Sequence, residues 1–215
     1  MGADADCILI PEVPVDYKVV YEDFKKTYIN RLKSSDVKGS TYIIVAAEGL
    51  KNKEGNFLTD ETNGSDSFGH LKLGGVGKYI RSHLESFMKE DNVWAEILKK
   101  EGIYVVDIYM YPEIREISLG HLVRAGSTSS YDVTFGKQGG GGAVLLIKNG
   151  IFGVTVVGVE AETVTYIPTQ EAIIQRHVNI NEIEFYEALG ICFGREPVEY
   201  KPQFTKQVGI IHRYM

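Results

Sequence analysis

The sequence has few cysteines, no long apolar run and no excess of positive charge, and each absence excludes a class of protein. Its 215 residues include only two cysteines, Cys7 and Cys192, too few for a disulfide framework or a four-thiolate metal site. No apolar stretch approaches the ~20 residues that span a bilayer, so we expect no membrane partner. The formal net charge of -6 argues against a nucleic-acid partner.

The composition is that of an ordinary globular protein. Hydrophobic residues make up 44% of the chain and charged residues 24%, which excludes disorder over the whole length. No basic region precedes an apolar one at the start, so we expect no signal peptide and a reducing, cytoplasmic setting. The chain enters an apolar run almost at once, as a piece of a longer protein would.

Apolar periodicity predicts strands that alternate with helices. This order predicts an α/β fold with a mostly parallel sheet flanked by helices. We expect a single domain over residues 1–215, with an inserted loop and helical segment at about 51–100. The predicted strands are 7–10, 41–47 and 103–110, the hairpin strands 153–159 and 163–167, and the helices 17–32, 76–88, 93–100, 133–148 and 182–189.

Four consecutive glycines, residues 139–142, interrupt the predicted helix over 133–148. Each costs roughly 1 kcal/mol relative to alanine inside a helix. Either the packing there is very tight, or the helix breaks. The run lacks the lysine and the preceding strand of a phosphate-binding loop, so we do not predict a nucleotide-binding site there.

Two arginines and a histidine gather within ten residues after the predicted strand 103–110: Arg115, His121 and Arg124. Guanidinium groups can bind phosphate oxygens in bidentate fashion, and a histidine adds a further donor. The same spacing also suits a solvated loop whose charges are paired internally. An anion site and an ion-paired loop both remain open from the spacing alone.

A single acid, Glu48, ends the apolar strand 41–47 and is followed by Gly49. In open α/β sheets, ligands bind at the carboxyl ends of strands. A carboxylate at that position can accept hydrogen bonds from sugar hydroxyls. Alternatively, it caps the next loop or helix.

Three segments resemble the phosphofructokinase family, and they occur in the family's order. Residues 5–12 (ADCILIPE) are similar to the strand ending in Pro-Glu that opens that family's C-terminal half. Residues 44–49 (IVAAEG) are similar to its second strand, which ends in Glu-Gly. Residues 115–127 (REISLGHLVRAGS) resemble its Arg…Leu-Gly-His-x-x-Arg-Gly-Gly-Ser-Pro signature. Over roughly residues 3–175, the chain resembles a phosphofructokinase C-terminal domain.

The resemblance implies the fructose 6-phosphate-binding half of a 6-phosphofructokinase, a glycolytic enzyme that transfers a phosphoryl group from ATP or pyrophosphate to the C1 hydroxyl. It implies that Glu48 accepts hydrogen bonds from the sugar hydroxyls and that His121 and Arg124 bind the 6-phosphate. It also implies that Arg115 reaches into the sugar site of a neighbouring subunit. Mg²⁺ would be bound mainly by the other half of the enzyme, which binds the phosphoryl donor. The implied ligand is fructose 6-phosphate. The implied protein partner is either a further copy of the chain, in a homo-oligomer, or a missing N-terminal half or partner subunit.

The chain also departs from the family. It contains no Gly-Thr-Ile-Asp-Asn-Asp stretch, where the family's catalytic base resides, so we assign no catalytic residue and no metal ligand and expect the chain alone to be inactive. In the signature, Ala125 replaces a glycine, and Val133 replaces the arginine after Tyr-Asp. The alternative is a non-catalytic regulatory module, in which the same side chains bind an effector phosphate.

Overall fold

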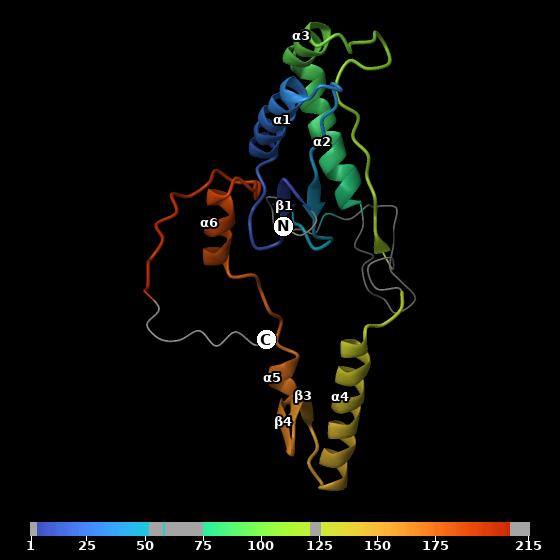
Figure 1. The fold of residues 1–215 in the computed structure, drawn as a ribbon, viewed down its shortest axis with the longest axis vertical. Helices are drawn as coiled ribbons and strands as arrows, with labels where there is room; N and C mark the ends of the chain where they lie inside the picture. The colour runs from blue at the N-terminus through green and yellow to red at the C-terminus, as the bar shows by residue number, and fades with distance from the viewer. Residues whose placement is uncertain (1–3, 52–57, 59–74, 121–125, 207–215) are drawn as a thin grey trace. The chain divides into compact units, whose positions relative to one another are not determined.

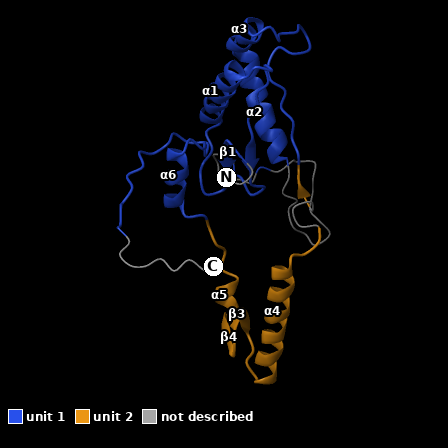
Figure 2. Cartoon of the chain, viewed as in Figure 1, with its two compact units in different colours: residues 1–117, 178–215 blue, residues 118–177 orange. Residues whose placement is uncertain are grey.

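The computed structural model describes residues 4–51, 58, 75–120 and 126–206 (Figure 1). The chain divides into two compact units (Figure 2). Unit 1 comprises residues 1–117 and 178–215, and unit 2 comprises residues 118–177. Each unit is described by itself, and the expectation of one domain over residues 1–215 stays a prediction.

A small parallel sheet forms the base of unit 1. Strand β1 (Cys7–Leu9) pairs in parallel with β2 (Ile44–Ala46), with Cys7 opposite Ile44. On the other side of β1, the Ile8 N–H donates to the Cys192 carbonyl at 2.9 Å. Both predicted strands are therefore confirmed, although β2 is shorter than the predicted 41–47.

Helix α1 (Tyr17–Ser34) starts where the sequence predicts, because Asp16 caps it. The Asp16 carboxylate accepts a hydrogen bond from the Lys18 N–H at 2.9 Å, satisfying a backbone donor that has no partner within the helix. Apolar side chains that recur every three to four residues form its buried face. These are Val20, Tyr21, Phe24, Tyr28, Ile29 and Leu32.

Helices α2 (Val76–Glu90) and α3 (Val93–Lys100) complete the main core. Trp94 of α3 is 1% exposed and stacks on Phe24 of α1, with ring centroids 5.3 Å apart. Its indole N–H donates to the Tyr21 hydroxyl at 2.9 Å, so this large side chain is buried with its polar atom satisfied. Both predicted helices are confirmed.

The predicted strand over 103–110 is wrong. Val105 and Tyr109 instead face each other across a tight turn, as an isolated antiparallel bridge. Asp107 lies in this turn at a φ of 60°, a left-handed conformation that aspartate tolerates better than most residues. The apolar composition suits a buried strand, but no neighbouring strand pairs with it among the described residues, and Ile108 is 82% exposed.

Unit 2 consists of a long helix and a hairpin. Helix α4 (Ser130–Lys148) begins three residues before the predicted 133, because Ser129 and Asp132 form a capping box. Strands β3 (Val154–Glu160) and β4 (Thr163–Pro168) form the predicted antiparallel hairpin, which the short helix α5 (Thr169–Ala172) follows.

The four glycines do not break α4. Only Gly142 is close to a neighbour: a Cβ built on it would lie 3.2 Å from methyl groups of Val159 and Val164 in the hairpin. A Cβ on Gly139, Gly140 or Gly141 would meet nothing within 4 Å. Tight packing therefore explains one of the four glycines.

The chain returns to unit 1 at Val178 and forms α6 (Ile180–Ala188), which confirms the predicted last helix. Ile183 of this helix joins Val13 and Phe193 in a second, smaller core. Glu187 is buried, and Arg195 donates to both of its carboxylate oxygens at 2.7 and 3.0 Å. This bidentate pair anchors the segment that follows the helix.

The mostly parallel sheet predicted for the chain is not confirmed. The described residues form two sheets of two strands each, one parallel and one antiparallel. The α/β content is confirmed. None of the helices in the described ranges is both long and apolar enough to cross a membrane.

Candidate functional site

Glu48 lies at the edge of the parallel sheet where both strands end. The Ala47 N–H donates to the Leu9 carbonyl at 3.0 Å, so the chain is still held against β1 one residue before Glu48. A Cβ on Gly49 would lie 3.4 Å from the Pro11 ring, which shows how closely the two strand ends approach. The Glu48 side chain is exposed, so it is available to a ligand at this edge.

Glu12, the acid of the Pro-Glu pair after β1, has a structural role that the sequence did not reveal. Its Oε1 accepts a hydrogen bond from the Val178 N–H at 3.1 Å. Val178 is the residue at which the chain re-enters unit 1. No local pattern could signal this contact, because the two residues lie far apart in the sequence.

Arg115 lies in unit 1, on the segment after the 105–109 turn, and its side chain is 79% exposed. Its Nη2 is 2.8 Å from a carboxylate oxygen of Glu113, which is also largely exposed. This hydrogen bond lowers the pKa of Glu113 and raises that of Arg115. Exposed pairs of this kind contribute little stability, so a phosphate group can compete with Glu113 for the guanidinium.

The neighbouring Glu116 shows where this segment runs. A Cβ on Gly77, in the first turn of α2, would lie 2.9 Å from Glu116 Oε2. The chain around Arg115 therefore passes directly against the start of α2. The absence of a side chain at residue 77 leaves space for the Glu116 carboxylate.

His121 and Arg124 lie outside the described residues, since residues 121–125 are not among them. The structure therefore does not test whether Glu48, Arg115, His121 and Arg124 come together. That arrangement stays a prediction.

Hydrogen bonds between Ser129 and Asp132 fix the start of helix α4. The Ser129 hydroxyl donates to Asp132 Oδ2 at 2.6 Å, and the Ser129 N–H donates to the same atom at 3.0 Å. In return, the Asp132 N–H donates to the Ser129 hydroxyl at 3.2 Å. These bonds from Ser129 lower the pKa of Asp132. The aspartate of the Tyr-Asp pair, Asp132, is thus the N3 residue of a capping box whose N-cap is Ser129, which the Ser-x-x-Asp spacing could have indicated.

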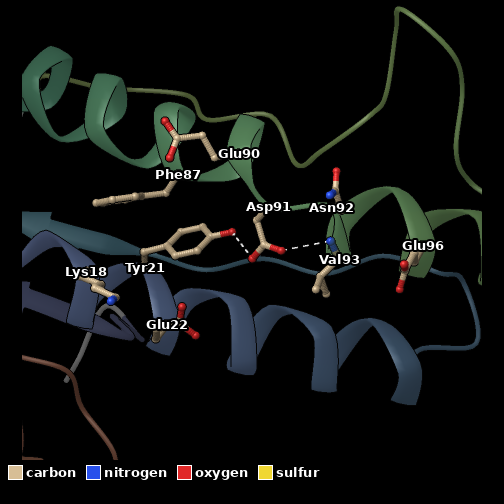
Figure 3. Close-up of a pocket in the computed structure, with 9 residues that line it drawn as sticks. All are labelled: Lys18, Tyr21, Glu22, Phe87, Glu90, Asp91, Asn92, Val93 and Glu96. Atoms are coloured by element: carbon tan, nitrogen blue, oxygen red, sulfur yellow. Dashed lines mark hydrogen bonds between the residues drawn. The ribbon is translucent and has the colours of Figure 1, made fainter.

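A separate hollow of about 410 Å³ lies between α1 and the junction of α2 with α3 (Figure 3). Asp91 sits at its centre and accepts hydrogen bonds from the Tyr21 hydroxyl at 2.8 Å and from Lys25 at 3.1 Å. Burial raises the pKa of Asp91, but the bonds from Tyr21, Val93 and Lys25 outweigh it and lower the pKa overall. The lining residues are Lys18, Tyr21, Glu22, Phe87, Glu90, Asp91, Asn92, Val93 and Glu96.

This hollow is a poor site for a phosphorylated sugar. Its lining includes four carboxylates and a single lysine, so its charge repels a phosphate. It includes none of the candidate residues Glu48, Arg115, His121 and Arg124. Among the described residues there is also no group of three or more histidines, cysteines or acids that could hold a metal ion.

Comparison with known proteins identifies relatives over nearly the whole chain. The sequence model of one family, described as Phosphofructokinase, matches residues 1–147. This range includes all four candidate residues. The chain is 28% identical over 199 residues to the ATP-dependent 6-phosphofructokinase 2 of Clostridium perfringens, covering 90% of this chain and 46% of that protein.

Relatives named for either phosphoryl donor match at similar identity. The chain is 30% identical over 199 residues to the pyrophosphate–fructose 6-phosphate 1-phosphotransferase of Dictyoglomus thermophilum, covering 91% of this chain and 47% of that protein. It is 28% identical to the ATP-dependent 6-phosphofructokinase 1 of Synechocystis, with 91% and 46% covered. The chain spans about half the length of the curated relatives it matches.

Proposed function

Because this chain belongs to the phosphofructokinase family, we propose that it is the fructose 6-phosphate-binding half of a 6-phosphofructokinase. The reaction is phosphoryl transfer from ATP or pyrophosphate to the C1 hydroxyl of the sugar phosphate. One observation carries the proposal: the family match over residues 1–147 spans Glu48, Arg115, His121 and Arg124 in the order of the family's motifs.

Each proposed role suits the chemistry of its side chain. Glu48 accepts hydrogen bonds from sugar hydroxyls at the carboxyl edge of the sheet, where its exposure supports this role. His121 and Arg124 hold the 6-phosphate, which needs several donors because it is doubly charged. Arg115 contributes to the sugar site of a neighbouring subunit, and its 79% exposed side chain can exchange the Glu113 carboxylate for a ligand there.

The proposal places the phosphoryl donor and most of the Mg²⁺ coordination outside this chain. When bound, the metal neutralises charge on the donor phosphates. The described residues offer no cluster of three or more histidines, cysteines or acids that could bind it. The names of the relatives include both ATP- and pyrophosphate-dependent enzymes, so the donor stays open between the two.

We further propose that another domain or subunit covers part of unit 2, in a cytoplasmic enzyme. A folded domain that works alone rarely exposes many large apolar side chains together. Unit 2 exposes such side chains on α4, on the α4–β3 connection and after β4. They include Tyr131, Phe135, Leu145, Ile147, Phe152, Ile173 and Ile174. The partner is either a donor-binding half of the enzyme or a further copy of this chain.

A thermal-shift titration with fructose 6-phosphate tests the sugar-phosphate role. A ligand that binds only the folded state stabilises it, by about 2.7 kcal/mol at a concentration one hundred times its Kd. We expect the unfolding midpoint of the wild-type chain to rise, and Arg124→Ala to abolish the rise. Arg176→Ala is the matched control, because Arg176 is an exposed arginine that the family motif does not include.

Equal shifts in the wild-type chain and in Arg124→Ala would contradict the assignment. Loss of the shift in Arg176→Ala as well would show that overall positive charge, rather than a built site, attracts the sugar phosphate.

A regulatory module is the second candidate function. The departures from the family signature favour it, because Ala125 and Val133 stand where the family has glycine and arginine. In this function the same acid and cations hold an effector phosphate. The gene sequence upstream of residue 1 discriminates between the two functions: a Gly-Thr-Ile-Asp-Asn-Asp segment there supports the enzyme, and its absence supports the regulatory module.

A further inference from the structure

The two cysteines lie far apart in the sequence, yet they are direct neighbours in unit 1. Cys7 in β1 and Cys192 after α6 are paired in a parallel bridge. The bridge is defined by two hydrogen bonds, from the Ile8 N–H to the Cys192 carbonyl at 2.9 Å and from the Cys192 N–H to the Asp6 carbonyl at 3.0 Å. Both thiols are free and buried, with Cys7 fully enclosed and Cys192 9% exposed.

This placement meets the geometric requirement for a disulfide. Adjacent strands lie about 4.7–4.9 Å apart, and a disulfide needs Cα atoms about 4.4–6.8 Å apart. Paired residues of neighbouring strands also direct their side chains to the same face of the sheet. The backbone bridge therefore places the two thiols side by side.

The environment distinguishes the two sulfurs. Cys192 Sγ accepts a hydrogen bond from the Gly194 N–H at 3.3 Å, in addition to the one from Cys7. The bond from Cys7 and that from Gly194 lower the pKa of Cys192, whereas the bond to Cys192 and burial raise the pKa of Cys7. A thiolate is the nucleophile in disulfide exchange, so Cys192 is the sulfur better prepared to react first.

We propose that Cys7 and Cys192 are a redox pair that forms an intrachain disulfide on exposure to a small disulfide oxidant such as oxidised glutathione. The Cys192 thiolate attacks one sulfur of the oxidant, and a glutathione thiolate leaves. Cys7 attacks the Cys192 sulfur of the mixed disulfide, and its proton passes to the second glutathione thiolate as that group leaves. The oxidant is reduced to two thiols, and the chain loses two protons and two electrons.

The bond would fasten the segment that follows α6 to the first strand of unit 1. Cys7 pairs with Ile44 at the start of the sheet, whereas Glu48 follows its opposite, carboxyl end. The disulfide would therefore clamp the segment after α6 without occupying the candidate sugar edge. That segment also supports the start of α1, since the Asp16 N–H donates to the Gly194 carbonyl at 2.7 Å.

The experiment treats the folded chain with oxidised glutathione and maps its peptides by mass spectrometry without reduction. We expect one linked pair of peptides containing Cys7 and Cys192, lighter than the separate peptides by two hydrogen atoms and cleaved by dithiothreitol. We also expect the oxidised chain to unfold at a higher temperature than the reduced chain, because a cross-link restricts the unfolded state.

Cys7→Ala and Cys192→Ala are the matched controls, and each should lose both the linked peptides and the thermal shift. Circular dichroism shows whether each variant remains folded. If a single-cysteine variant does not fold, peptide mapping of the wild-type chain still decides the question. Stable glutathione adducts or linked dimers in place of the intrachain bond, or an intrachain bond formed only in urea, would overturn the proposal.

Discussion

Replacement of Gly142 by alanine would insert a methyl group between α4 and the hairpin of unit 2. The added Cβ would lie 3.2 Å from one methyl group each of Val159 and Val164, and 3.3 Å from one of Val156. Carbon atoms pack best about 3.5–4.0 Å apart, so all three contacts are too short. Because the valines come from both strands, side chains of both strands must give way by a few tenths of an ångström to relieve them.

Two opposing contributions determine the magnitude. Alanine favours the helix by roughly 1 kcal/mol over glycine, whereas inserting a carbon into a packed contact typically costs about 1–3 kcal/mol. Gly141→Ala has the same helical gain and meets nothing within 4 Å. We therefore expect Gly141→Ala to be stabilised by roughly 1 kcal/mol, and Gly142→Ala to be less stable than Gly141→Ala by about 1–3 kcal/mol.

Urea denaturation of the full chain, followed by circular dichroism, measures both free energies of unfolding. The comparison isolates the hairpin contact, because the two positions are adjacent in the same helix and differ in what the new methyl group meets. Equal stabilisation by the two substitutions would refute the reasoning, since it would show that α4 does not pack against the hairpin at Gly142.

Two further predictions concern Asp91 and the activity of the chain. The folded-state pKa of Asp91 is below its ordinary 3.8, so its stabilising effect is complete above about pH 5 and is lost as the pH falls through the folded pKa. In Asp91→Asn, the free energy of unfolding should therefore fall less steeply as the pH is lowered below about 5. The same fall in the variant as in the wild-type chain would contradict the stabilising role of Asp91. Second, the purified chain should transfer no phosphoryl group from ATP or pyrophosphate in an aldolase-coupled assay, because it lacks the family's donor-half motifs. Clear turnover would show that the chain is complete in itself.

Elements governed by local signals could be predicted from the sequence. Asp16 and the apolar stripe behind it define the start and the buried face of α1. The hairpin of unit 2 follows from alternation and a short turn, because its partner strand is the next segment along the chain.

Elements that depend on distant partners could not be predicted. The segment 103–110 has the composition of a strand, but composition does not reveal whether another strand lies beside it. The contact of Glu12 with Val178 was missed for the same reason.

The same distinction between local signals and distant contacts applies to the candidate site. The position of Glu48 at the end of a strand is a local property, and the structure agrees with the expectation. The meeting of Glu48 with Arg115, His121 and Arg124 depends on segments that include residues outside the described ranges, and it stays a prediction.

The interrupted path of unit 1 has a consequence for how the protein is made on the ribosome. Its second core joins Val13, near the start of the chain, to Ile183 and Phe193, which are synthesised only after all of unit 2. Until then, Glu12 has no Val178 amide to accept from, and β1 lacks its neighbour at Cys192. Nascent chains generally fold domain by domain from the N-terminus, but here unit 1 starts to emerge before unit 2 and can be completed only after it.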